Sequence, residues 1–193
     1  MKQKNVRIFL LMLVTFLVYW FLNYGVVAEL RLRESIYEHA QTSAYFHNIQ
    51  EILPYRSPYL GDASNTGNLF YHLPLHQYPM TFAIEPETCT LTVHYDTAAK
   101  TVEKIRENLA YNTLAAMAAI DNLQCIQYEF QDGTYCITRQ QVEERFDVPL
   151  SALLDDTEQW EKATQHEIFL ETVLAEWFPM EIDAPCSSDS QQV

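Results

Sequence analysis

The sequence has few of the residues from which common catalytic and nucleotide-binding motifs are built. Four glycines occur in 193 residues, and no P-loop, dinucleotide fingerprint or Gly-x-Ser-x-Gly elbow is present. The four cysteines include no Cys-x-x-Cys pair, so neither a redox motif nor a zinc knuckle is indicated. Motifs therefore predict no catalytic residue, no metal site and no cofactor.

Positive charge is scarce as well. The chain has 12 Lys and Arg against 26 Asp and Glu, and its net charge is −14. After Ala28 there are nine basic and 26 acidic residues, so this part carries −17. Such a surface repels phosphate backbones and anionic headgroups, which argues against nucleic acid as a partner. Cations, basic peptides or a basic protein stay open, and so does the simpler interpretation that the charge serves solubility.

Charged residues are missing altogether from Ile8 to Ala28. About 20 apolar residues is the length that a helix needs to cross a hydrocarbon core of about 30 Å. Tyr19, Trp20 and Tyr24 lie toward the far end, where aromatic rings favour the membrane interface. We therefore predict a transmembrane anchor over residues 1–28.

Basic residues flank this segment on both sides. Lys2, Lys4 and Arg7 precede it, and Arg31 and Arg33 follow it, which narrowly favours a cytoplasmic N-terminus. The prediction is a single-pass protein of the cell membrane whose C-terminal domain is extracytoplasmic. The alternative is a signal peptide cleaved at the small residues that end the segment, which would give a secreted protein.

Beyond the anchor, hydrophobic periodicity predicts an α+β domain. Helical spacing predicts a juxtamembrane helix over residues 29–53, ended by Pro54. Alternation within 80–95 and 125–138 predicts two β-hairpins, and 100–122 between them has helical spacing. We expect a four-stranded antiparallel sheet with helices on one face, in a domain over residues 54–178. The polar tail, 179–193, is predicted to be disordered.

Turn residues predict the register of each hairpin. A two-residue turn at Pro86-Glu87 places Ile84 opposite Cys89 and makes Cys89 a small core residue. In the second hairpin, Asp132-Gly133 is a strong two-residue turn signal.

That second turn places Cys136 opposite Glu129. Cys125 and Cys136 are then offset by four residues, about 13 Å, too far for a disulfide without a register slip.

Two capping signals follow along the chain. Thr138-x-x-Gln141 predicts a short helix, and Asp156-x-x-Gln159 predicts a final helix to about Phe178.

Histidines offer the main route to an enzymatic hypothesis. His166–Glu171 resembles the zinc-peptidase helix motif, but Leu170 occupies the position of the second histidine ligand. His94 is the best candidate for a general base, paired with Cys125, Cys136 or a carboxylate in a cell-envelope hydrolase.

The densest stretch of motif residues is Pro54–Pro74, "PYRSPYLGDASNTGNLFYHLP". One interpretation is structural, in which Arg56 pairs with a carboxylate and Asp62 or Ser64 caps a short helix. The other is a polar cluster that contacts a ligand or partner, with the candidate binding residues Arg56, Tyr59, Asp62, Asn65 and Asn68.

This stretch also resembles an uncharacterised bacterial family of membrane-anchored extracytoplasmic domains. The matching elements are Tyr55-Arg56, Tyr59, Gly61-Asp62, Ser64, Gly67-Asn68-Leu69 and Leu73-Pro74. The resemblance extends over about Leu53 to Phe178 and carries no activity with it. In some relatives a similar domain follows a metallopeptidase-like sensor. That neighbouring domain suggests a signalling role by analogy only.

Three functional hypotheses follow. The first is a non-enzymatic, membrane-anchored extracytoplasmic domain that binds an envelope protein or a small ligand and acts in envelope sensing or regulation. The second is the envelope hydrolase centred on His94. The third is a structural subunit of a membrane complex.

Overall fold

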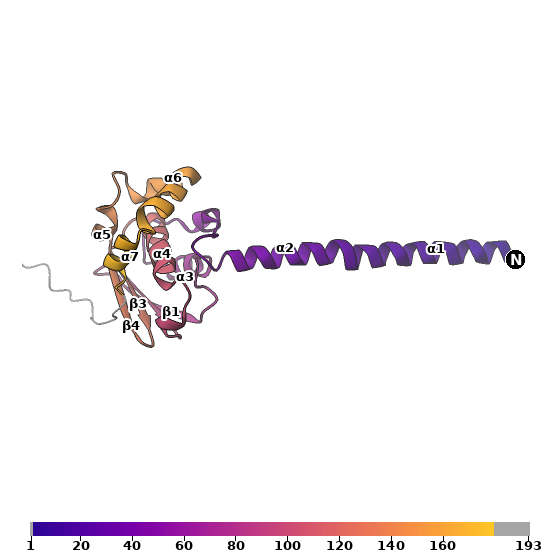
Figure 1. The fold of residues 1–193 in the computed structure, drawn as a ribbon, viewed down its shortest axis with the longest axis horizontal. Coiled ribbons are helices and arrows are strands. Elements are labelled where there is room, and N and C mark those ends of the chain that lie inside the picture. Colours follow the sequence, from indigo (N-terminus) through magenta and orange to yellow (C-terminus); the bar gives the residue numbers. More distant parts are fainter. Residues whose placement is uncertain (1, 180–193) are drawn as a thin grey trace, which may run out of the picture. The chain divides into compact units, whose positions relative to one another are not determined.

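The computed structural model describes residues 2–179, and Figure 1 shows its fold coloured along the sequence. The predicted disorder of the tail concerns residues outside this range, apart from Pro179. The chain divides between Ala40 and Gln41 into two compact units. Each unit is described by itself.

The first unit is a continuous helix. It comprises α1 (Lys2–Phe21), a π-helical stretch (Leu22–Val26) and α2 (Val27–Ala40). Proline is absent from this segment, and its apolar side chains from Val6 to Val26 are exposed. By length and composition the helix could cross a membrane, a property that it shares with signal sequences.

The predicted helix over residues 29–53 is interrupted. The structure ends α2 at Ala40 and begins a 3-10 helix only at Ile49, which continues to Tyr55. Between them, side-chain oxygens accept from backbone N–H groups: Ala44 N–H donates to Asn108 Oδ1 at 2.9 Å, and Asn48 N–H donates to Gln41 Oε1 at 2.8 Å. Side-chain hydrogen bonds to the backbone compete with helix formation, which explains the break.

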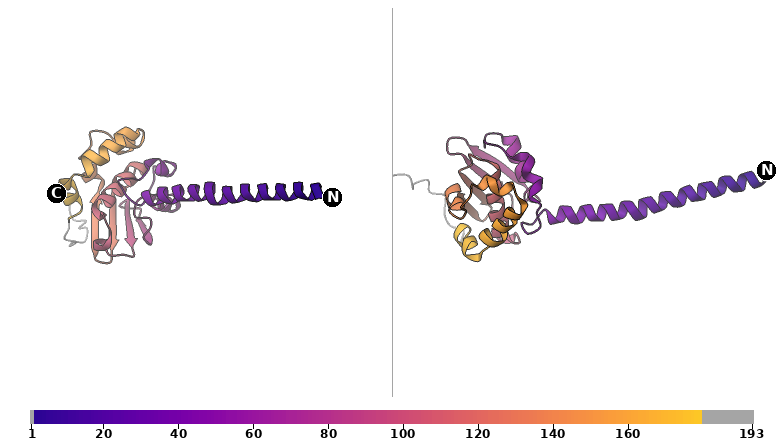
Figure 2. Two further views of the ribbon diagram at one scale, coloured as in Figure 1. Left: turned by 45° about the vertical axis from the view of Figure 1, so that its right-hand side comes forward. Right: turned by 90° about the horizontal axis from the view of Figure 1, so that it is seen from above.

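The second unit contains a four-stranded sheet in the order β1-β2-β3-β4. Its strands are β1 (Met80–Glu85), β2 (Thr90–Tyr95), β3 (Cys125–Phe130) and β4 (Gly133–Thr138). They lie side by side in Figure 2. The α+β class and the two hairpins separated by a helix are confirmed.

One detail of the predicted sheet is wrong, because the sheet is mixed. β1 and β2 are antiparallel, as are β3 and β4, but β2 and β3 are parallel. The cause is the connection through α4 (Ile105–Ala119), which returns the chain to the end of the sheet where β2 begins. Such a strand–helix–strand crossover joins parallel neighbours.

Both hairpin registers differ from the prediction by two residues. Ile84 pairs with Leu91, because the first turn has four residues and Cys89 within it takes a left-handed backbone conformation, φ 50°. Tyr128 pairs with Tyr135, because Gln131 and Asp132 form the second turn. An even shift keeps every side chain on its expected face. Because Cys89 lies within the four-residue turn, it is a half-buried turn residue and not part of the core.

The remaining helices are short. They are α3 (Ala63–Tyr71), a 3-10 helix (Ala99–Thr101), α5 (Arg139–Glu143), a 3-10 helix (Leu150–Leu154), α6 (Thr157–Lys162) and α7 (Glu171–Trp177). The predicted capping box at Thr138 is present. Asp156 caps α6 as predicted, but a π-helical stretch (Ala163–Ile168) and a bend at Leu170 divide the predicted final helix into two.

One face of the sheet forms the core with these helices. Every residue of α4 from Asn108 to Ala119 is buried, and its alanines let the helix lie close to the strands. The core face of the sheet carries large apolar side chains, and the opposite face is polar. The buried strand residues on the core face are Met80, Leu91, Val93, Tyr95, Ile126, Tyr128, Phe130, Tyr135 and Ile137.

Candidate interaction surface

The stretch Pro54–Pro74 is attached to the end of α4 by backbone hydrogen bonds. Ser57 N–H donates to Ala119 O at 2.8 Å, and Asp121 N–H donates to Ser57 O at 3.1 Å. Leu60 N–H donates to the side-chain Oδ1 of Asn122 at 2.7 Å. These bonds fix the path of the chain before α3 begins.

Two of the predicted binding residues organise the start of α3. The carboxylate of Asp62 accepts from Asn65 N–H at 2.9 Å and so caps the helix. The amide of Asn65 donates to Tyr55 O at 2.7 Å. Both side chains therefore stabilise the local fold.

Arg56, a third predicted binding residue, also forms its contacts within the domain. Its guanidinium donates to Asp155 Oδ1 at 2.7 Å and to Ser151 O at 3.3 Å. These contacts connect the stretch to the Leu150–Leu154 helix, 95 to 99 residues further along the chain. This is the arrangement that the structural interpretation predicts for Arg56.

The other two predicted residues face solvent. Tyr59 is 69% exposed and Asn68 is exposed on α3. The structure adds Tyr71, which sequence reasoning missed; it is 53% exposed, and its ring contacts Phe82 of β1 edge-on at 5.9 Å. Large exposed aromatics of this kind are common anchors of protein interfaces. We define Asn68, Tyr71 and Phe82 as the α3–β1 surface.

The predicted hydrolase site is assembled only in part. His94 Nδ1 lies 2.7 Å from Glu129 Oε2 on the polar face of the sheet. Cys125 pairs in register with Thr90, four residues before His94, so these two side chains are not brought together. Thr81 of β1 lies in register with His94 on the side away from Glu129.

The two cysteines of the second hairpin are close, contrary to the prediction. Cys125 Sγ lies 3.3 Å from Cys136 Sγ, because the observed register offsets them by two residues and not four. Burial is the main cause that raises the pKa of the Cys125 thiol. This disfavours the thiolate that nucleophilic catalysis would need.

A hydrogen-bonded network of aromatic and imidazole rings lies below the stretch. His47 Nε2–H donates to His72 O at 2.5 Å, and His47 Nδ1 accepts from the Tyr111 hydroxyl at 2.9 Å. The same hydroxyl accepts from Trp160 Nε1–H at 3.2 Å. Burial is the main cause that lowers the pKa of His47 to about 4. His47 is neutral at pH 7 and bridges elements far apart in the sequence.

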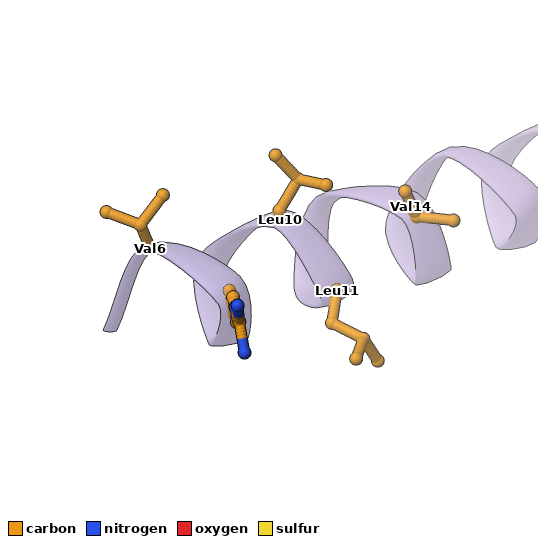
Figure 3. Close-up of a pocket in the computed structure, with 5 residues that line it drawn as sticks. Val6, Leu10, Leu11 and Val14 are labelled. Carbon is orange, nitrogen blue, oxygen red and sulfur yellow. The ribbon is translucent and has the colours of Figure 1, made fainter. Parts of the chain in front are cut away.

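The structure offers little support for a bound metal or an enclosed ligand. Among residues 2–179, no group of three His, Cys, Asp or Glu side chains is placed to hold a metal ion. An open hollow of about 420 Å³ lies on α1, as Figure 3 shows. One helix cannot surround a ligand, so we assign none to this hollow. Its lining residues are Val6, Arg7, Leu10, Leu11 and Val14.

Comparison with known proteins identifies part of the folded unit. A search of curated proteins and a search of solved structures found no match to the chain. A family model described as "Domain of unknown function (DUF4825)" matches residues 52–142. These residues include the stretch Pro54–Pro74, both hairpins and α4. The predicted resemblance to a family of unknown function is thus confirmed over residues 52–142, whereas its expected extent to Phe178 is not matched.

Proposed function

We propose that this protein is a membrane-anchored, extracytoplasmic binding domain without catalytic activity. The observation that carries the proposal is the apolar helix from Gln3 to Ala40, none of whose hydrophobic window is buried within the protein. An isolated helix with this much exposed apolar surface needs a hydrophobic environment, and a bilayer provides one. The basic residues before the span favour a cytoplasmic N-terminus.

The α3–β1 surface is the proposed contact site for a partner. Asn68, predicted from the sequence, is exposed there, and Tyr71 lies beside Phe82; Tyr59, also predicted, is exposed in the segment before α3. Arg56, Asp62 and Asn65 support the proposal indirectly, because their hydrogen bonds hold the stretch and α3 in place. We therefore assign binding to the exposed aromatic residues near the polar cluster and not to the polar cluster itself.

Photo-crosslinking in intact cells tests this site. A photoreactive phenylalanine analogue placed at Tyr71 should give a discrete adduct of the full chain with one envelope protein. The matched control places the same analogue at Val148, which is 43% exposed and lies elsewhere in the domain. Equal adducts from both positions, or none from Tyr71, would contradict the proposed contact site.

The second candidate function is a hydrolase that uses His94 and Glu129. It is favoured by their 2.7 Å contact and by the register position of Thr81 beside His94. Against it, both side chains are about two-fifths exposed, at 43% and 40%, on an open sheet face that does not exclude water. Hydrolysis of an envelope substrate by the purified chain that disappears in His94→Ala would establish it in place of the binding role.

A further inference from the structure

The outer edge of β1 carries unpaired backbone hydrogen-bonding groups. Asp96 N–H donates to Pro79 O, at the position directly before β1. Consecutive residues of a strand direct their backbone N–H and C=O groups to opposite sides. Thr81, Ala83 and Glu85 therefore direct theirs to β2. Phe82 and Ile84 therefore direct theirs outward, and among residues 2–179 no strand lies on that side of β1.

This edge lacks the usual protection against strand pairing. β1 pairs with β2 without a bulge, it contains no proline or lysine, and its only charge is Glu85 at the end. Natural edge strands are commonly protected by such features. On β1 the exposed side chains are those of Thr81, Ala83 and Glu85, so the polar face of the strand is accessible from solvent.

The charges around this edge indicate which kind of segment would pair with it. From Ser57 to Ala99 the sequence contains no Lys or Arg and four carboxylates, Asp62, Glu85, Glu87 and Asp96. This range includes α3, β1 and β2, which form the edge and its surroundings. A basic segment complements this charge, whereas a second copy of the acidic domain would be repelled.

We infer that the edge of β1 accepts an extended, basic segment of a partner protein as an additional strand. Backbone hydrogen bonds to Phe82 and Ile84 give the affinity, and the exposed Tyr71 ring beside Phe82 contacts a side chain of the added strand. This inference rests on the proposed binding function and names the chemistry of the partner.

Hydrogen exchange on the full chain in detergent micelles tests the edge directly. In the unbound protein, the amides of Phe82 and Ile84 should exchange fast and those of Thr81 and Ala83 slowly. A synthetic peptide that alternates lysine and valine should slow Phe82 and Ile84 by at least about tenfold. Binding without protection at β1, no binding, or slow exchange at Phe82 and Ile84 before peptide is added would each overturn the inference.

Matched variants test the chemistry. Ala83→Lys should weaken peptide binding at least about tenfold, because it adds a positive charge to the exposed side of the edge strand. Thr134→Lys makes the same change on β4, the opposite edge strand, and should bind the peptide as the parent does. Unchanged α4 exchange in both variants confirms folding.

A peptide that alternates glutamate and valine is the charge control. If it binds as tightly as the lysine peptide, the basic chemistry is wrong. These results are independent of the location of the domain, so failure of the strand-pairing inference is distinguishable from failure of the proposed extracytoplasmic anchoring.

Discussion

Acidification should destabilise the folded domain through His47. In the neutral side chain, Nε2–H donates to the His72 carbonyl and Nδ1 accepts from the Tyr111 hydroxyl. A second proton on Nδ1 would face that hydroxyl, which already accepts from Trp160 Nε1–H. The nearby charged and titratable groups are His72, His76 and Glu51. Glu51 and the hydrogen bond to the His72 carbonyl favour the charged imidazole, whereas charge on His76 or His72 opposes it.

The pKa values give the size and sign of this effect. An unfolded histidine has a pKa of about 6.5, whereas burial lowers the pKa of folded His47 to about 4. Between these values the unfolded chain binds the extra proton, so stability falls as the pH falls below 6.5 and levels off near 4. At 1.36 kcal/mol for each pKa unit, the loss is about 2 kcal/mol at pH 5 and about 3 kcal/mol at pH 4.

Denaturant unfolding of the full chain in micelles, followed by tryptophan fluorescence, measures this loss. Carboxylates also titrate in this range, so the comparison is with His47→Gln, which keeps a donor for the His72 carbonyl but does not titrate. The difference in unfolding free energy between parent and variant should shrink by about 3 kcal/mol from pH 7.5 to pH 4. A difference that does not change with pH would refute the assignment of a neutral, buried His47.

Three further predictions concern stability, measured by the same unfolding assay. Arg139→Gln should lower the free energy of unfolding by about 2–4 kcal/mol, because the guanidinium donates to three carbonyls at and beyond the C-terminus of α4. The control Arg145→Gln removes only a surface contact with Glu176, so it should lower the free energy of unfolding by less than about 1 kcal/mol. Asp62→Ala should cost about 1 kcal/mol and Asp62→Ser much less, since serine also caps; equal costs would contradict the capping role. Tyr111→Phe should cost about 1–3 kcal/mol, because it leaves the Trp160 indole N–H without an acceptor, and an unchanged stability would contradict the network.

Local signals predicted most of the elements. Alternation identified the strands, the capping box identified α5, and the alanines of α4 predicted a helix that lies close to the sheet. The registers were wrong because turn length is not determined by turn residues alone. Cys89 takes a left-handed conformation that non-glycine residues rarely adopt, and this lengthens the first turn. The parallel pairing of β2 and β3 depends on where α4 returns the chain, which is a tertiary property.

The candidate site was predicted less completely than the fold. The identity of Arg56 suggested a carboxylate partner, but not that it would be Asp155, 99 residues away. His47 follows the helical spacing predicted for residues 29–53, and its actual contacts, with Tyr111 and the carbonyl of His72, are 64 and 25 residues distant. Tyr71 gave no signal of its own, because its exposure beside Phe82 depends on how α3 packs on β1.

The central claim is that the helix at the N-terminus anchors a domain outside the cytoplasm. Labelling of intact cells with a membrane-impermeant maleimide tests it, with Glu158→Cys as the reporter on exposed α6 and Asn5→Cys as the reporter before the apolar span. The parent chain gives the background from its own cysteines, and the size of the labelled, membrane-bound chain shows whether the helix is retained. We expect labelling of Glu158→Cys in intact cells on a full-length chain, and labelling of Asn5→Cys only after lysis. Labelling of Asn5→Cys in intact cells and of Glu158→Cys only after lysis would contradict the account.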